Sequence, residues 1–147
     1  MKDSIPSTDC ILETKDLRMS FGNIHVLKGI NTSIYRGQVS VIIGASGAGK
    51  STFLRCLNRL ETPTSGDILF NGVSLMHAGH NLTKLRQHIG MVFQMFNLFD
   101  NMNILNNVTI GPRIVKKVRP SEAEEMGIKL LERVGLADKA YAYPSQL

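Results

Sequence analysis

A glycine-rich segment followed by a lysine and two hydroxyl residues is the part of the chain best equipped for chemistry. It matches the pattern G-x-x-x-x-G-K-[ST] of the P-loop, or Walker A motif, and its residues are Gly44, Ala45, Ser46, Gly47, Ala48, Gly49, Lys50, Ser51 and, one position beyond, Thr52. Glycines permit backbone angles that aim successive N–H groups at one point, and such a nest at a helix N-terminus binds anions. The pattern therefore predicts a site for the phosphates of a nucleoside triphosphate.

The side chains that end the motif have distinct expected roles. Lys50 should reach the β- and γ-phosphates, Ser51 should ligate Mg²⁺ through its hydroxyl, and Thr52 should add a contact to the α-phosphate. The alternative interpretation is a glycine-rich turn with a purely structural role. The flanking elements favour the first, because a P-loop lies between a buried strand and the start of a helix.

Both flanks have the required pattern. Residues 39–43 are a short, nearly all-apolar run that ends at Gly44, which is typical of a parallel strand covered on both faces. From Lys50 onward the apolar residues follow helical spacing and a proline lies just beyond them: Phe53, Leu54, Leu57, Leu60 and Pro63. The sequence therefore predicts a strand, a phosphate-binding loop and a helix in succession.

Strand patterns lie on either side of this unit. Residues 11–35 alternate in polarity around turns at Gly22-Asn23 and Arg36-Gly37, and residues 67–76 form two short strands around Asn71-Gly72, a strong hairpin signal. We expect these stretches to share one antiparallel sheet. A short helix over 81–87 and a second parallel strand over 88–93 should complete an interrupted βαβ core.

From residue 101 the signal becomes helical. Asn103 can cap a helix through Val115, which Gly111-Pro112 should bend or break. Ser121 and Glu124 form a capping box for a second helix, whose predicted apolar face consists of Met126, Leu130, Leu131 and Val134, and which ends at Gly135. We therefore divide the chain into a β-subdomain with part of an α/β core, 1–100, and the start of a helical subdomain, 101–147.

Composition narrows the class of protein. The 147 residues are 43% apolar and 20% charged, which excludes a disordered chain and a small disulfide scaffold, and no stretch approaches the ~18 apolar residues of a membrane-spanning helix. The first 13 residues lack the apolar segment of a secretory signal, and Cys10 and Cys56 are isolated thiols, which favours a reducing, cytoplasmic setting. The net charge is +5, and the densest basic stretch, Lys116, Lys117 and Arg119, is short and is followed at once by Glu122, Glu124 and Glu125. No basic stripe with interleaved aromatics predicts a nucleic-acid site, whereas an anionic small ligand or a membrane surface fits the excess.

Several motifs along the chain, the P-loop among them, together carry a resemblance to a known family. They are Phe21-Gly22, Val26-Leu27-Lys28-Gly29, the P-loop, Leu54-Arg55 with Leu57-Asn58, Pro63-Thr64-Ser65-Gly66, Gly90-Met91-Val92-Phe93-Gln94 and Phe96-Asn97-Leu98-Phe99. Together they resemble the ATP-binding cassette (ABC) family, specifically the ATPase subunits of bacterial uptake systems for polar amino acids. The resemblance implies an α/β fold: a P-loop NTPase core with an N-terminal antiparallel β-subdomain and the beginning of an α-helical subdomain, its sheet incomplete.

The same resemblance implies roles for residues outside the P-loop. Phe21 lies where the family stacks an aromatic on adenine, and Gln94 lies where an amide contacts Mg²⁺ and water. The groove that receives a helix of a membrane permease would involve Phe96, Leu98, Phe99 and Met102, although Met95 and Asp100 stand where relatives often have Gln and Pro. The implied ligands are ATP and Mg²⁺, the implied partners a permease and a second ATPase subunit, and the implied location the inner face of the plasma membrane. The histidines, at positions 25, 77, 80 and 88, are expected to be surface residues rather than metal ligands.

Hydrolysis in this family needs an acidic residue that holds Mg²⁺ and a group that positions the attacking water. No apolar strand ending in Asp-Glu follows residue 94, and the family signature Leu-Ser-Gly-Gly-Gln would begin at Leu147. Two interpretations stay open: the N-terminal part of a transport ATPase, and a polypeptide that binds nucleotide at most and tends to self-associate through unpaired strand edges. A P-loop ATPase of another ABC branch is a third interpretation, whereas a P-loop protein of DNA repair is less consistent with residues 96–99 and with the transporter-like flanks.

Overall fold

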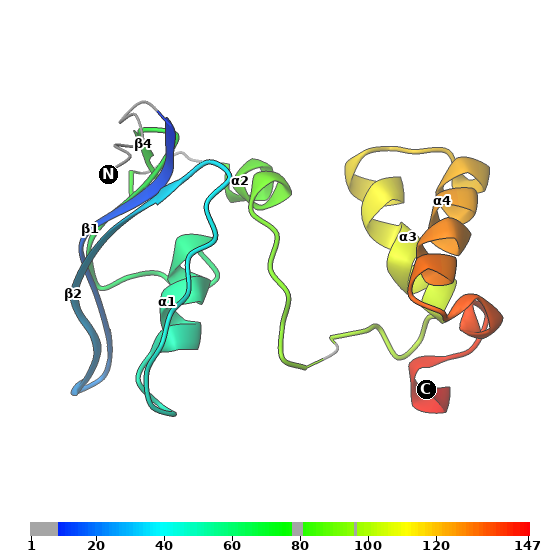
Figure 1. Cartoon of the computed structure of the whole chain (residues 1–147), viewed down its shortest axis with the longest axis horizontal. Helices are drawn as coiled ribbons and strands as arrows, with labels where there is room; N and C mark the ends of the chain where they lie inside the picture. Colours follow the sequence, from blue (N-terminus) through cyan, green and yellow to red (C-terminus); the bar gives the residue numbers. More distant parts are fainter. Residues whose placement is uncertain (1–8, 78–80, 96) are drawn as a thin grey trace, which may run out of the picture. The chain divides into compact units, whose positions relative to one another are not determined.

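The computed structural model describes residues 9–77, 81–95 and 97–147. The chain forms two compact units that divide between Met91 and Val92, and each is described by itself. The first holds the sheet, the P-loop and two helices, and the second is helical (Figure 1). Two residues with predicted roles, Phe96 and His80, lie outside the described residues.

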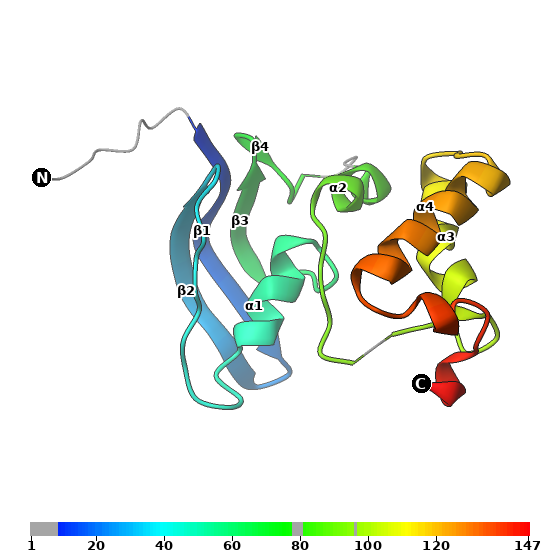
Figure 2. The same cartoon turned by 45° about the vertical axis from the view of Figure 1, so that its right-hand side comes forward.

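The first unit is built on an antiparallel sheet of four strands in the order β2-β1-β3-β4. The strands are β1 (Cys10–Phe21), β2 (Ile24–Tyr35), β3 (Ser65–Phe70) and β4 (Val73–Ser74). The strands expected around the turn at Gly22-Asn23 and the hairpin expected at Asn71-Gly72 are therefore confirmed, and they share one antiparallel sheet (Figure 2). At the second turn Asn71 and Gly72 both have positive φ, 49° and 76°, as a tight two-residue hairpin requires.

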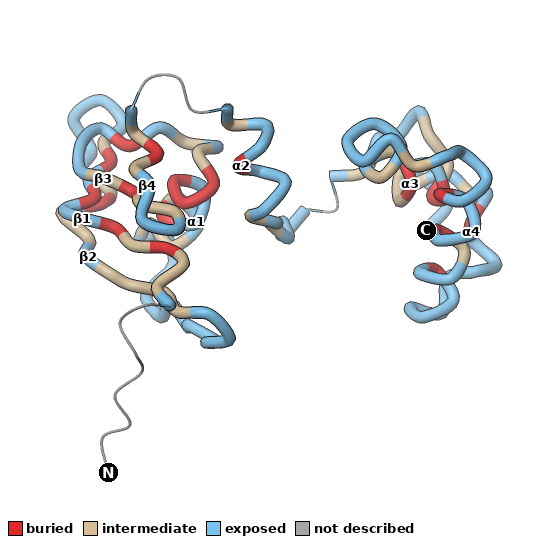
Figure 3. Tube along the Cα trace, turned by 90° about the horizontal axis from the view of Figure 1, so that it is seen from above, coloured by how far each residue is buried: buried red, intermediate tan, exposed pale blue. Residues whose placement is uncertain are grey.

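Helix α1 (Lys50–Leu57) packs its apolar side against this sheet. Phe53, Cys56 and Leu57 from the helix join Leu17 and Ile68 from the strands in the core, where the buried residues of this unit gather (Figure 3). Helix α2 (Leu82–His88) begins where the sequence predicts, with the Asn81 side chain accepting from the Lys84 N–H at 3.1 Å, and it adds Leu85 to the same core. This core fixes the helix that follows the P-loop.

The two predicted parallel strands are absent from the described residues. Residues 39–43 have no secondary structure, with Val39 88% and Ile43 91% exposed, and residues 89–93 form no strand, with Val92 98% exposed. An apolar run indicates that a segment would be stabilised by burial of its side chains. It forms a strand only where the backbone of a neighbouring strand is available to pair with its N–H and C=O groups. No described residue pairs with either segment.

The second unit consists of α3 (Ile104–Val115), α4 (Pro120–Arg133) and two short 3₁₀ turns, η2 (Ala137–Lys139) and η3 (Pro144–Gln146). Asn103 caps α3 as predicted, accepting from the Asn106 N–H at 2.8 Å. Gly111-Pro112, expected to bend or break the helix, does not break it: α3 runs through Pro112, whose carbonyl accepts the Lys116 N–H at 3.1 Å and closes the last turn. None of the described helices is long and apolar enough to cross a membrane.

The sequence-based description of α4 was wrong at its start and on its buried face. The helix begins at Pro120 with Arg119 as N-cap, so Ser121 lies inside the first turn and makes no capping bond. Its buried residues are Ala123, Gly127 and Leu131, whereas Met126, Leu130 and Val134 are exposed. The reason is close packing: a Cβ at Gly127 would lie 2.6 Å from Leu105 Cδ1, so the small residues face α3. Gly135, with φ 72°, ends the helix as predicted.

The two thiols should differ sharply in reactivity. Burial, with a smaller effect of the Glu61 carboxylate, raises the pKa of Cys56 from 9.0 to about 11, whereas Cys10 is half-buried on β1. Because the thiolate is the reactive form, a disulfide reagent at pH 8 should label Cys56 of the native Cys10→Ser variant about 100-fold more slowly than the unfolded chain. Rapid labelling of that native variant would contradict the buried position.

The raised pKa of Cys56 also predicts how stability depends on pH. The free energy of unfolding should fall as pH rises from 9.0 toward about 11, because the thiol of the unfolded chain loses its proton first.

Candidate nucleotide-binding site

The loop before α1 has the backbone shape that its glycines predict. Gly47 and Gly49 have φ of 78° and 87°, in the left-handed region that a Cβ disfavours. The Ala48 N–H donates to the Ala45 carbonyl at 3.2 Å, and the Phe53 N–H donates to the Gly49 carbonyl at 2.8 Å where the helix begins. The loop therefore turns the chain directly into the N-terminus of α1.

Gly49 holds that helix end close to the sheet. A Cβ at Gly49 would lie 2.8 Å from Val26 Cγ1 and 3.3 Å from Leu27 Cδ2, so a larger residue would push the loop away from β2. No side chain caps α1 at this N-cap, and its first turn contains no acidic residue. The N–H groups and the positive end of the helix dipole are thus available to an anion without competition from a carboxylate.

Lys50, the first residue of α1, curls back over the loop. Its Nζ donates to the carbonyl oxygens of Gly44 at 2.9 Å and Ala45 at 2.7 Å. None of the ion pairs among the described residues involves Lys50, so its charge is offset only by carbonyl dipoles. An ammonium group held in this way at the mouth of the loop can exchange carbonyl oxygens for phosphate oxygens at small cost.

Ser51 and Thr52 continue the first turn of α1, Ser51 exposed and Thr52 half-buried. A hydroxyl that is exposed one residue after the loop lysine suits Mg²⁺, which prefers oxygen ligands and keeps several of its waters. The residues present therefore fit the ion that the sequence pattern predicts.

Phe21 lies in the same unit as the loop, at the end of β1 and paired with Ile24 across the hairpin turn. Its side chain is 47% exposed, and that of Ile24 is 69% exposed. An aromatic ring left open at a strand end is available for stacking, whereas a core residue would be covered. This position is compatible with the adenine contact that the sequence predicts.

The remaining predicted residues lie in the second unit. Gln94 is exposed, so its contact with the nucleotide stays a prediction. Of the predicted permease groove, Leu98 and Met102 are half-buried and Phe99 is 53% exposed. Leu98 packs against the cluster of Ile104 and Leu105 at the start of α3.

One residue that organises this segment was missed by sequence reasoning. The Asn107 side chain accepts from the Phe99 N–H at 2.7 Å and donates to the carbonyls of Phe99 and Met102, each at 3.1 Å. This clamp fixes residues 99–102 against the first turns of α3. The only signal in the sequence was a polar residue four positions after the Asn103 cap, which by itself predicts nothing.

A glycine loop with left-handed glycines, a lysine at the first helical position and a helix packed on a sheet are features of the P-loop of nucleoside triphosphatases, although residues 39–43 do not form the strand that normally precedes this loop. The sequence model of the ABC transporter family matches residues 27–147, and the chain belongs to this family. The expected fold class, a P-loop NTPase fold with an incomplete sheet, is thereby confirmed, although the strands that the described residues form belong to the antiparallel sheet and the two predicted parallel strands are not among them.

Curated relatives of this chain are named as transport ATP-binding proteins. It is 49% identical over 127 residues to the glutamine transport ATP-binding protein GlnQ of Geobacillus stearothermophilus and 50% identical over 127 residues to the glutamate transport ATP-binding protein GluA of Corynebacterium glutamicum. Each match covers 86% of this chain and 52% of the relative. The chain therefore spans about half the length of the curated relatives it matches.

A solved structure supports the same fold. The ATP-binding cassette MJ0796, determined as a dimer in a post-hydrolysis state with ADP and Pi, superposes with a TM-score of 0.80 at 29% identity. The match covers 93% of this chain and 63% of that protein.

Proposed function

We propose that the chain binds ATP through the loop at residues 44–52 and acts in the ATP-binding subunit of an importer of polar amino acids. The observation that carries the proposal is the geometry around Lys50, whose ammonium lies over a loop of left-handed glycines at an uncapped helix N-terminus. Family membership and the transport names of the relatives supply the rest.

Mg²⁺ would accompany the nucleotide. Ser51 would supply one oxygen ligand from α1 and Gln94 a second from the segment after Met91, with water and phosphate oxygens completing the shell. Bound there, the ion would offset the negative charge of the β- and γ-phosphates. The chain's own part is to hold the phosphates with backbone N–H groups and to place the Lys50 ammonium against them.

Phe21 is proposed to stack on the adenine ring, and a pair of substitutions tests this role. Phe21→Ala should weaken ATP binding about tenfold, because a stacked aromatic contributes about 1–3 kcal/mol, whereas Phe21→Tyr should bind as the parent does, because the ring is retained. Binding of a fluorescent ATP analogue, displaced by ATP, measures both variants. Equal affinities for the alanine and tyrosine variants would show that Phe21 has no role in binding.

Dependence on phosphate tests the nucleotide site itself. In a displacement assay with the 147-residue chain, ATP should compete far better than AMP, and adenosine should compete weakly, because the loop recognises the β- and γ-phosphates. Equal competition by the three ligands would contradict the proposed site. Omitting Mg²⁺ should weaken the binding of ATP more than that of AMP.

The proposal also includes a role in transport, with a cargo, partners and a location. The relatives' names support polar amino acids as cargo, and the dimeric cassette supports a second ATPase subunit as a partner. A permease that contacts the surface at Leu98, Phe99 and Met102, and a place on the inner face of the plasma membrane, are further parts of the proposal that rest on the family resemblance. A chimera in which this chain replaces the matching residues of the Geobacillus GlnQ should support glutamine uptake. Phe99→Asp in the chimera should abolish uptake while ATP binding is retained, and full uptake by that variant would contradict the permease contact.

A further inference from the structure

The corner where α3 gives way to α4 is unusually basic. Four cations lie there, on the last turn of α3 and on the connection that follows: Arg113, Lys116, Lys117 and Arg119, which together with Ile114 and Val115 we call the basic corner. All four cationic residues are exposed, and none takes part in an ion pair among the described residues. Positions 101–121 contain no acidic residue, and Glu122 is the first after Asp100.

Fold stability does not account for two of these cations. Lys117 has φ 55°, a left-handed position after a helix end where glycine is favoured, so a lysine there carries strain. Arg119 is the N-cap of α4, where a short polar or acidic side chain would stabilise the helix and a cation opposes its dipole. By contrast, Arg113 and Lys116 at the C-terminus of α3 favour its dipole. Local structure therefore does not explain the cations at these two positions, and a site that breaks local rules is where a function is expected.

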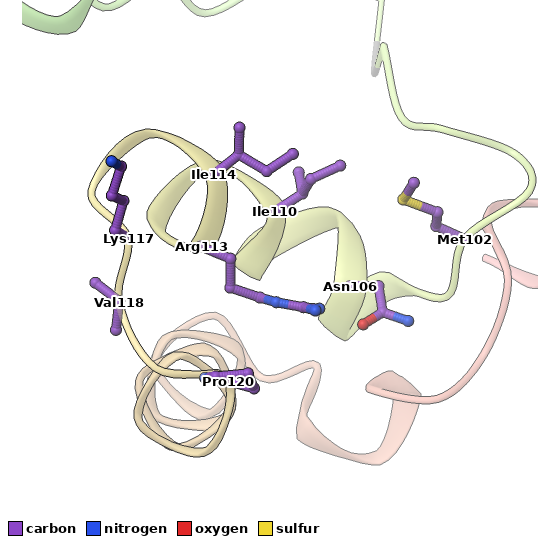
Figure 4. Close-up of a pocket in the computed structure, with 8 residues that line it drawn as sticks. All are labelled: Met102, Asn106, Ile110, Arg113, Ile114, Lys117, Val118 and Pro120. Atoms are coloured by element: carbon purple, nitrogen blue, oxygen red, sulfur yellow. The ribbon is translucent and has the colours of Figure 1, made fainter.

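Exposed aliphatic side chains accompany the cations. Ile114 is 69% and Val115 47% exposed. Ile114 also lines an open pocket of about 600 Å³ together with Met102, Ile110, Arg113 and Lys117. Figure 4 shows Ile110 and Ile114 projecting together from α3, with Lys117 on the loop that follows the helix. The corner therefore combines exposed aliphatic side chains with cations at neighbouring positions of the chain, although Figure 4 shows Arg113 directed away from Ile114.

This combination favours one class of partner. Residues 100–140 contain no aromatic side chain, so the stacking platforms of single-stranded nucleic-acid sites are missing. Two of the four cations, Lys116 and Lys117, are hydrated point charges that suit a diffuse layer of anionic headgroups, and the guanidinium groups of Arg113 and Arg119 can bind the headgroup phosphates. Adjacent aliphatic side chains can enter the boundary of the acyl chains. We propose that the basic corner binds directly to the surface of an anionic lipid membrane. The contact requires neither nucleotide nor permease and so goes beyond the proposed function.

A tryptophan probe tests the contact directly, because the chain contains no Trp. In the Ile114→Trp variant, emission should shift to the blue when vesicles of mixed phosphatidylcholine and phosphatidylglycerol are added, and should not shift with phosphatidylcholine alone or with inorganic phosphate. The matched control Val73→Trp, at an exposed position on β4, should show no shift with any vesicle. No shift for Ile114→Trp, or an equal shift with both vesicle types, would overturn the proposal.

A second pair of variants separates function from folding. Lys117→Gly with Arg119→Ser removes two charges and relieves both unfavourable positions, so the Tm should rise or stay the same while affinity for the anionic vesicles falls about 30-fold, roughly fivefold for each cation. The control Lys28→Gln with Lys84→Gln removes the same charge from exposed positions elsewhere and should change affinity less than threefold. If both pairs of variants lost the same affinity for the vesicles, the effect would come from net charge alone and not from the basic corner. Soluble polyglutamate that displaces the protein from labelled vesicles as effectively as unlabelled anionic vesicles do, at the same salt concentration, would assign the corner to an acidic protein partner. Equal losses for the two pairs of variants, or this displacement by polyglutamate, would overturn the proposed lipid site.

Discussion

Lys50→Ala is expected to weaken ATP binding by about 100-fold. The ammonium is the only positive side chain that the structure places on the phosphate-binding loop, and a charge-assisted bond to a phosphate contributes about 1.5–3 kcal/mol. The carbonyls of Gly44 and Ala45, which accept from Lys50, are on exposed residues and would be hydrated in the variant, so the free energy of unfolding should change by less than about 0.5 kcal/mol.

Displacement of a fluorescent ATP analogue measures the loss, and Lys28→Ala is the matched control. Lys28 is an exposed lysine on β2 of the same unit, so its removal changes the net charge equally and should leave affinity within about twofold. Lys50→Arg should bind better than the alanine variant but less well than the parent, because the larger guanidinium keeps the charge in a different shape. Parent-like affinity of Lys50→Ala would refute the assignment of the loop.

The same variant decides between the two interpretations of turnover. One of the two interpretations left open predicts that residues 1–147 bind nucleotide at most, because hydrolysis in the family that the sequence resembles needs an acidic residue for Mg²⁺ and a group that positions the attacking water. Mg²⁺-dependent ATP hydrolysis by this polypeptide, lost in Lys50→Ala, would show that the prediction is wrong. Binding without turnover in the parent would agree with it.

Local chemistry explains which elements the sequence could predict. The hairpin at Asn71-Gly72, the cap at Asn103 and the loop at Gly47 and Gly49 each depend on residues next to one another in the chain, and all of them are found. The glycines need positive φ and the asparagine needs a nearby N–H, so their structural consequences do not depend on distant neighbours.

Elements that depend on neighbours from elsewhere were predicted less well. The run at 39–43 has the composition of a buried strand, yet without a ladder partner among the described residues it is exposed. The buried face of α4 was assigned to large apolar residues, but Ala123 and Gly127 face α3 because their small size permits close packing. For the site, the loop could be recognised from one motif, whereas the Asn107 clamp depends on a turn eight residues away and left no pattern to find.

Gly66→Ala is expected to destabilise the first unit by about 3–5 kcal/mol. Gly66 has φ 89°, and a Cβ there would lie 2.3 Å from the Asp16 carbonyl oxygen and 2.7 Å from Leu17 Cα. These are backbone atoms of β1, at the irregularity where its pairing with β3 shifts register between Lys15 and Arg18, so they cannot rotate away as a side chain would. Strand β3 would have to separate from β1, which exposes Ile68 and opens the core under α1.

Urea unfolding of the variant and of a matched glycine substitution checks this result. Gly72→Ala also replaces a glycine of positive φ, 76°, in the same unit, but a Cβ there meets nothing within 4 Å. It should therefore cost only the backbone strain of about 1–2 kcal/mol. A loss at Gly66 no larger than that at Gly72 would mean that β1 can move aside. A large loss at Gly66 alone would show that close backbone contact between β1 and β3 holds the sheet that supports the phosphate-binding loop.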